Sequence, residues 1–402
     1  MQKFNSYFSA ILFFIFFIFY PINNLLVTLT ISPFSTLSIV APFVAIGLLH
    51  MVLAYKDTLN LIIYKIPIFS IFAFLTILLI ILESYIYQDA TYVPTLHLNA
   101  YNAYWIIFCL GGMLFTFYFK YLFISIRDNI FLLITLSSLF LIVFVVFVTH
   151  FSLIDFISRT FLSEDSPINY QTLSDYIVLG SFLLIAKFFK RDLILLAISL
   201  IIFLELFLLG SRSAIFFYIA SIFLLFVKEK RFVFLFLSIS IVSILLAIFI
   251  DDIIKHYADD PRIMSMFGGH YLQDASLKER EEQFIHNLRF IKDSWLTGGI
   301  YSEYLVDGVG TYIHNYVAYL QNFGILPFIV VNILIVKIVY NLIIYNRDTF
   351  IFRFIFLSTI FTLLSMFLSR SYDATWVLLI LAISEGYFYM LKEGELDEDS
   401  TN

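Results

Sequence analysis

The motif Gly210-Ser211-Arg212-Ser213 places an arginine between two hydroxyl groups, where one apolar segment ends and the next begins. Gly210 fits the position that ends a helix, and Ser211 or Ser213 can cap the helix that follows. Free backbone N–H groups at a helix start, hydroxyl groups and a guanidinium together suit a phosphate group. The alternative is a tight turn whose arginine reaches the lipid headgroups.

Arg280 is the second candidate, because it lies on the apolar side of a predicted helix. This helix is expected to start at the capping-box sequence Ser276-Leu277-Lys278-Glu279 and to end at about Leu296. At about 100° per residue, one narrow stripe contains Arg280, Phe284, Leu288, Ile291 and Trp295. The stripe is expected to pack onto the membrane-embedded part of the protein. The alternative for Arg280 is snorkelling, with the stem packed and the head in water. Arg289 lies on the opposite face and is expected to be a solvated charge.

His314 and Asn315 open a later apolar segment, behind a glycine-rich stretch with Gly298, Gly299, Gly308 and Gly310. An ordinary histidine has a pKa near 6.5, so His314 could accept a proton from a substrate at neutral pH. The alternative is a polar residue that only caps the helix at the membrane interface.

Two further arginines are weaker candidates because a carboxylate lies close to each in the sequence. Arg370 precedes Asp373, and Arg159 precedes Glu164 and Asp165. The sequence contains no H-E-x-x-H or C-x-x-C pattern and no Asp-x-Asp pair in the segments assigned to the outer side. We therefore expect no metal and no cofactor.

The elements that position these residues are expected to be transmembrane helices. The chain has 402 residues, of which 61% are hydrophobic and 13% charged, against about 45–50% and about 25% in soluble domains. A single soluble core stops growing at about 250–300 residues, so most of the apolar surface is expected to face lipid. The single cysteine, Cys109, has no disulfide partner.

A transmembrane helix needs about 20 mostly apolar residues. Twelve segments qualify: 7–30, 35–54, 61–82, 103–123, 130–150, 174–189, 192–209, 213–228, 232–250, 313–337, 350–369 and 373–391. The first is interpreted as a retained span, because no small-residue cleavage site follows it. The pair within 174–209 could instead be one helix and a re-entrant segment.

The basic residues indicate the orientation of these spans. With both termini in the cytoplasm, fifteen of the 24 basic residues lie on the cytoplasmic side, and the short outer loops hold only Arg159, Arg212 and Arg370. The positive-inside rule counts short loops, so this orientation is favoured. The three outer arginines break the rule, and a charge of this kind near a membrane is a functional hypothesis by default.

The predicted fold is an all-α integral membrane protein with about twelve spans and one large outer loop that contains short helices. Residues 1–250 would hold spans one to nine, 251–312 the outer loop, 313–391 the last three spans, and 392–402 a cytoplasmic tail.

The order of these motifs resembles the O-antigen polymerase and O-antigen ligase superfamily. The Gly210-Ser-Arg-Ser motif is similar to the first signature of that family, and a large outer loop with Arg280 ahead of a glycine-rich turn is similar to the second. The stretch from His314 to Gly324, His-Asn-Tyr-Val-Ala-Tyr-Leu-Gln-Asn-Phe-Gly, is similar to the element that closes the loop. The sequence from Trp295 to Gly299 departs from the family, where a proline and a more regular G-x-G are usual.

The resemblance implies an enzyme of bacterial surface polysaccharide or lipopolysaccharide biosynthesis in the cytoplasmic (inner) membrane. Such enzymes transfer glycans from undecaprenyl pyrophosphate in an inverting, metal-independent reaction. Arg212 and Arg280 would bind the pyrophosphate, and His314 would assist the acceptor hydroxyl or orient the phosphate. The substrate-binding set would be Ser211, Arg212, Ser213, Arg280, Asn315 and Arg370. Expected partners are the lipid-linked oligosaccharide, the bilayer, a chain-length regulator and a flippase, and no nucleic acid.

Three classes of function stay open at this point. A polymerase is favoured over a ligase of the same superfamily. A lipid-linked sugar flippase or another transporter would need ionisable groups in mid-span and repeated halves, and Glu205 is the only deeply placed acidic residue that we expect. A scaffold without catalysis would leave Arg212, Arg280 and His314 far apart, whereas an enzyme needs them to converge.

Overall fold

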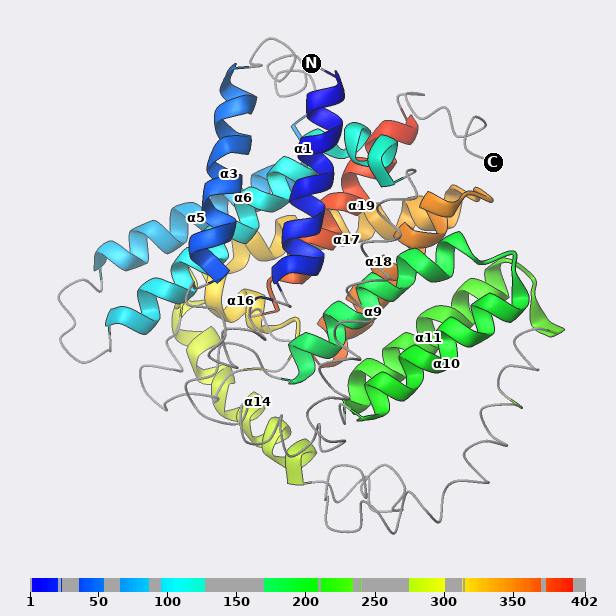
Figure 1. Cartoon of the computed structure of the whole chain (residues 1–402). Coiled ribbons are helices and arrows are strands. Elements are labelled where there is room, and N and C mark those ends of the chain that lie inside the picture. Colours follow the sequence, from blue (N-terminus) through cyan, green and yellow to red (C-terminus); the bar gives the residue numbers. More distant parts are fainter. Residues whose placement is uncertain are drawn as a thin grey trace. The chain divides into compact units, whose positions relative to one another are not determined.

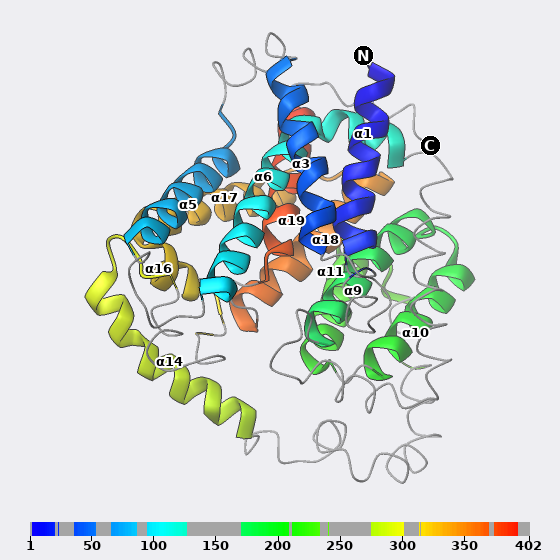
Figure 2. The same cartoon turned by 60° about the vertical axis from the view of Figure 1, so that its left-hand side comes forward.

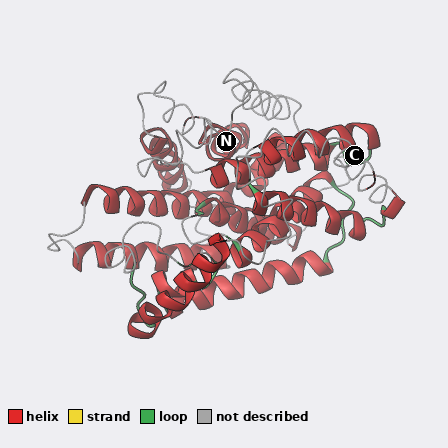
Figure 3. Cartoon of the chain, turned by 90° about the horizontal axis from the view of Figure 1, so that it is seen from below, coloured by secondary structure: helices red, strands yellow, loops and turns green. Residues whose placement is uncertain are grey.

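The protein is helical throughout the part of the chain that its computed structural model describes (Figure 1). The described residues are 2–20, 23, 36–53, 66–86, 95–126, 170–208, 211–233, 240, 275–300, 313, 315–369 and 374–392. Within these ranges there is no strand (Figure 3). The all-α prediction is therefore confirmed for the described residues.

The helices coincide with long apolar runs of the sequence. In chain order they are α1 (Gln2–Phe14) with the π-helical turn η1 (Ile15–Phe19), α3 (Thr36–Leu53), α5 (Ile68–Ile86), α6 (Thr95–Ile126), α9 (Tyr170–Lys187), α10 (Asp192–Leu208), α11 (Arg212–Lys228), α14 (Ala275–Ser294), α16 (Ala318–Phe323), α17 (Ile325–Ile344), α18 (Phe350–Leu368) and α19 (Trp376–Lys392).

Three of the described helices are long and apolar enough to cross a membrane. They are Ile68–Tyr85 within α5, the whole of α17 and the whole of α18. Shorter apolar helices cover Tyr7–Phe17, Ser38–Leu53 and Asn102–Tyr118. These helices support a membrane protein, and the total of twelve spans stays a prediction. The predicted span 130–150 and nearly all of 232–250 lie outside the described residues.

The predicted single span 313–337 is wrong. Residues Ala318–Phe323 form the short helix α16, and a new helix, α17, starts at Ile325. Gly324 separates them with φ 70° and ψ −174°, a conformation that is open to glycine and strained for other residues. The apolar sequence runs on through the break, so hydropathy alone does not reveal it. The weak pair within 174–209 forms two separate helices, α9 and α10.

The chain divides into two compact units. The first consists of Met1–Phe131, Gln283–Thr349 and Thr362–Asn402, and the second of Leu132–Glu282 and Phe350–Phe361.

The centre of the first unit is α6, which packs against α1, α3, α5 and α19. Two glycines allow the close approach. A Cβ atom at Gly111 would lie 2.5 Å from Cζ of Phe16 in η1, and one at Gly112 would lie 3.3 Å from Cβ of Ala382 in α19. Small residues at such crossings let the surrounding side chains interlock, which is how helices associate in lipid.

A buried carboxylate fixes the start of α5 in the same unit. Glu385 in α19 is 2% exposed, and its two carboxylate oxygens accept the backbone N–H groups of Ile68 at 3.0 Å and Phe69 at 2.8 Å. The ammonium group of Lys337 in α17 lies 2.8 Å from the same carboxylate. Three helices therefore meet at one charge, which satisfies N–H groups that a helix start leaves without a partner.

In the second unit, α9, α10 and α11 lie side by side (Figures 1 and 2). The rings of Phe182 and Tyr218 stack with centroids 5.9 Å apart, and Phe361 packs edge-on against Phe182, also at 5.9 Å. This aromatic core joins α9 and α11 to the first part of α18.

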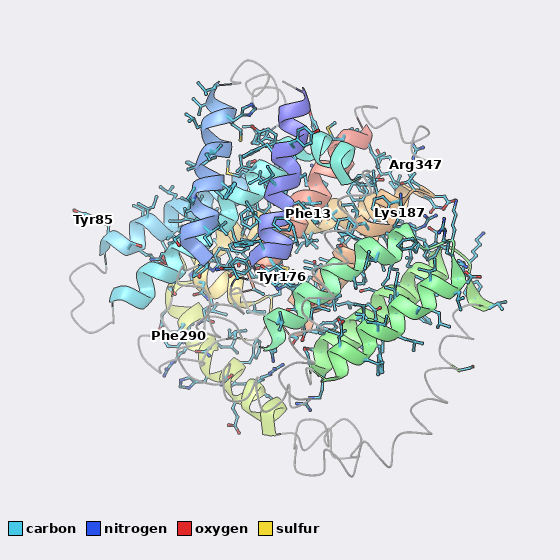
Figure 4. The ribbon with its side chains drawn as sticks, in the orientation of Figure 1. Phe13, Tyr85, Tyr176, Lys187, Phe290 and Arg347 are labelled. Atoms are coloured by element: carbon cyan, nitrogen blue, oxygen red, sulfur yellow. The ribbon has the colours of Figure 1, made fainter. Side chains whose placement is uncertain are left out.

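Charged residues connect the helix ends of the second unit around Lys187, which is labelled in Figure 4. Arg353, only 4% exposed, lies 3.3 Å from a carboxylate oxygen of Glu229. Its guanidinium is 4.8 Å from the ring centroid of Phe189. Arg231 pairs with Asp192 and donates to the carbonyl oxygen of Phe189. These contacts hold the two turns that follow α9 and α11 against α18.

Candidate functional site

The first candidate segment lies at the start of α11. Ser211 is the residue before the first helical turn, and its carbonyl oxygen accepts the N–H of Ile215 at 3.1 Å. The N–H of Ser211 reaches back to the carbonyl oxygen of Leu206 at 3.4 Å. The predicted helix start is thus confirmed, with Ser211 in the capping position and Ser213 already inside α11.

The side chain of Ser211 does not form the predicted cap. The residue is 1% exposed, and its hydroxyl oxygen is buried with no hydrogen-bond partner among the described residues. Burying a hydroxyl without a partner costs on the order of 1–3 kcal/mol. Arg212, the next residue, is half-buried and already takes part in an interaction within the chain.

The second candidate, Arg280, is half-buried in α14. The prediction of which side of α14 faces the protein is partly wrong. Leu288 and Trp295, which the sequence placed on the buried stripe, are 42% and 53% exposed, whereas Asn287 is completely buried. The buried side is therefore rotated by roughly 60° from the predicted stripe, at about 100° per residue. Arg280 lies on both the predicted and the observed buried side.

The glycine-rich turn after α14 lies directly against the end of α16. The N–H of Gly299 donates to the carbonyl oxygen of Gln321 at 3.0 Å. Gly298 and Gly324 have φ of 81° and 70°, and a Cβ atom at Gly324 would lie 2.6 Å from the nitrogen of Gly298. The two glycines belong to separate motifs of the sequence, and the structure brings them together.

Glu83 belongs to this junction and is not among the site residues predicted from the sequence. One of its carboxylate oxygens accepts the N–H of Ile300 at 2.8 Å, which ties the turn to the end of α5. The available signal was an acidic residue at the end of an otherwise apolar helix, because such a charge usually has a partner.

The third candidate segment surrounds Asn315. Its side-chain oxygen accepts the N–H of Val317 at 2.9 Å, which shapes the turn before α16. The hydroxyl of Tyr316 donates to the side-chain oxygen of Asn332 in α17. His314 and Arg370, the other candidates from this part of the prediction, lie outside the described residues, as does Arg159.

The expectation that Glu205 is the only deeply placed acidic residue is wrong. Glu385 is 2% exposed and Asp175 completely buried. Glu205 differs from Glu385 in its surroundings, because both of its carboxylate oxygens are buried without a hydrogen-bond partner among the described residues. The carboxylate of Glu385 has hydrogen-bond and ion-pair partners that account for its burial. The carboxylate of Glu205 has no such partners among the described residues.

The candidates fall into both units. Ser211, Arg212, Ser213 and Arg280 belong to the second unit and Asn315 to the first. The convergence of the arginines with His314 stays a prediction. Within the described ranges, no group of three or more histidine, cysteine, aspartate and glutamate side chains is arranged to hold a metal ion.

The chain was compared with protein families, curated proteins and solved structures. No family model, no curated protein and no solved structure matches the chain.

Proposed function

We propose that this protein is a polysaccharide polymerase of the O-antigen type, which joins oligosaccharide repeat units carried on undecaprenyl pyrophosphate at the outer face of a bacterial cytoplasmic membrane. The observation that carries the proposal is the buried, unpartnered hydroxyl of Ser211 at the start of α11, next to Arg212. A helix start, a hydroxyl and a guanidinium form a site for phosphate oxygens.

The proposed reaction is a displacement at the anomeric carbon of the donor sugar. An acceptor hydroxyl oxygen forms the new bond to that carbon, and the bond to the pyrophosphate oxygen breaks with inversion. The electron pair leaves with the pyrophosphate, and the proton of the acceptor hydroxyl passes to His314. The products are a longer lipid-linked glycan and free undecaprenyl pyrophosphate.

The chemistry explains why arginines are needed. Negative charge develops on the leaving pyrophosphate, and a preorganised positive group stabilises it. Arginine meets phosphate oxygens through two parallel hydrogen bonds. In the proposed site Arg212 and Arg280 supply this charge in place of a divalent ion. A ligase of the same superfamily would use the same chemistry and differ in its acceptor, which is the completed lipid A core.

The experiment is complementation of a strain that lacks the native gene. R212A, R280A and His314→Ala are each expected to abolish the ladder of long surface polysaccharide, because losing one group that stabilises transition-state charge costs about 10²–10³ in rate. R289A is the matched control, since Arg289 is exposed on another side of α14 and should leave the ladder intact.

The gel also separates the related functions. A deletion strain that retains a single repeat unit on its surface indicates a polymerase, and one that retains none indicates a ligase. Normal long polymer in all three variants, with membrane protein levels unchanged, would show that the proposed mechanism is wrong.

Glu205 supports a second candidate, a flippase or other transporter driven by protons. A carboxylate with both oxygens buried inside an apolar helix is a common feature of proton relays. In that case E205Q would abolish transport of lipid-linked units in membrane vesicles, and R212A would leave it intact. The polymerase proposal expects E205Q to retain the polysaccharide ladder.

A further inference from the structure

Helix α14 has an exposed apolar row that no part of the described chain covers. Ile285 is 62% exposed, and Leu296, in the turn after the helix, is 58% exposed. Leu288 and Trp295 complete the row. A row of large apolar side chains along one helix marks a surface that meets a partner or a membrane.

The row is one of three sides that run along the last part of α14. At about 100° per residue, the buried side is centred on Asn287, and the polar side carries the exposed residues Arg289 and Asp293. The apolar row lies between them and includes one charge, the exposed Lys292. A helix with separate buried, apolar and polar sides can rest against protein, lipid and water at the same time.

The Trp295 end of α14 is fixed to helices of the first unit that are long enough to cross a membrane. Ile300, just beyond Trp295, donates its N–H to Glu83 near the end of α5, and Gly299 donates to Gln321 just before α17 begins. Both α5 and α17 are candidate spans. The point where one span ends and another begins is the boundary between hydrocarbon and headgroups.

The residues at this end of α5 also fit a membrane surface. Figure 4 shows Tyr85 at this same end of α5, where its side chain is 79% exposed. Tryptophan and tyrosine concentrate at membrane interfaces, where an apolar ring and a polar tip are both satisfied.

We propose that Ile285, Leu288, Trp295 and Leu296 insert into the lipid leaflet at the Tyr85 end of α5, so that α14 is an interfacial helix. Lys292 in the row extends its ammonium group to the lipid phosphates, as basic residues of such helices do. The inference rests on the apolar row and its anchorage, and is independent of the glycan-transfer proposal.

The test is tryptophan fluorescence of the full-length protein in phosphatidylcholine vesicles. Trp105 and Trp376 are each 1% exposed, so Trp295 is the tryptophan open to contact. Lipids brominated in the acyl chains should quench the wild-type emission, and this quenching should be lost in W295F. Aqueous iodide should leave the Trp295 emission unchanged. Quenching of Trp295 by iodide alone, or by neither agent, would overturn the proposal.

Spin labels at two positions of α14 provide a second test with a matched control. The native Cys109 is buried, so only the introduced cysteines should react with the label. A label at Leu288→Cys should collide with oxygen, which dissolves in lipid, more often than with a water-soluble nickel complex. A label at Asp293→Cys on the polar side should show the reverse. Equal exposure of both positions to the nickel complex would place α14 in water and contradict the inference.

Discussion

Gly298 and Gly324 form a junction at which two backbone segments touch without room for a side chain. A Cβ atom at Gly324 would lie 2.5 Å from the carbonyl oxygen of Leu296. Both glycines also have φ in the left-handed region. The junction therefore depends on glycine twice, once for space and once for backbone conformation, and it holds the turn after α14 in place.

Gly324→Ala is expected to lower the stability of the protein by about 2–3 kcal/mol, because alanine brings both the overlap and a backbone strain of this order. The measurement is the apparent Tm of the purified protein in detergent. Gly180→Ala is the control, since nothing lies within 4 Å of a Cβ atom at Gly180 in α9. That change should keep or raise the Tm. An unchanged Tm for Gly324→Ala would show that the junction is not rigid.

Local features of the candidate site can be predicted from the sequence, whereas contacts between distant segments cannot. The Gly-Ser-Arg-Ser pattern predicts the start of α11 to within one residue and leaves the capping residue open between Ser211 and Ser213, because turn and capping preferences are local. The missing cap hydrogen bond is not local, since it depends on what surrounds the hydroxyl in the folded chain. For the same reason, the charge of Glu83 at the end of an apolar helix indicates that a partner exists but does not identify that partner as Ile300.

At the scale of elements, Glu385 replaces a local helix cap with one from a distant helix. It accepts two N–H groups at the start of α5 and pairs with Lys337 of α17. The three helices are far apart in the sequence, so the contact fixes their mutual positions in the first unit. The side chain of Glu385 is 1% exposed and that of Lys337 is 41% exposed, so the two partners are not equivalent.

Glu385→Ala should therefore destabilise the protein more than Lys337→Met. The first change removes the acceptor of two buried N–H groups and of the ammonium, which costs on the order of 3 kcal/mol. The second keeps the apolar stem and leaves the carboxylate with both N–H donors, so a cost of about 1 kcal/mol or less is expected. Thermal unfolding of the two variants in the same detergent measures the difference. An equal or larger effect of Lys337→Met would contradict this account.

The ends of a helix can be predicted from the sequence where polar residues mark both ends of its apolar run. The helices α3, α10, α11 and α18 begin and end within about two residues of the predicted spans, because basic or small polar residues lie at their ends. The break at Gly324 was missed because the apolar run continues through it, and the orientation of α14 was mispredicted because apolar content was taken as burial. In α14 the buried position is an asparagine, and apolar residues are exposed.

At the scale of the whole molecule, two described contacts join helix ends that the predicted orientation places on the same side. They are the hydrogen bond between Glu83 and Ile300 in the first unit and the ion pair between Arg353 and Glu229 in the second. The number of spans and their alternation across the membrane stay predictions. The absolute direction, with both termini in the cytoplasm, rests on the distribution of basic residues.

The central claim is that Arg212 and Arg280 stabilise a lipid pyrophosphate while a glycan is transferred. The most direct test uses purified protein in liposomes with an undecaprenyl-pyrophosphate-linked repeat unit and excess EDTA. The account predicts longer glycans, one undecaprenyl pyrophosphate released per new bond, and a loss of about 10²–10³ in rate for R212A but not for R289A. Equal rates for wild-type protein and R212A, or elongation that stops when EDTA is added, would contradict it.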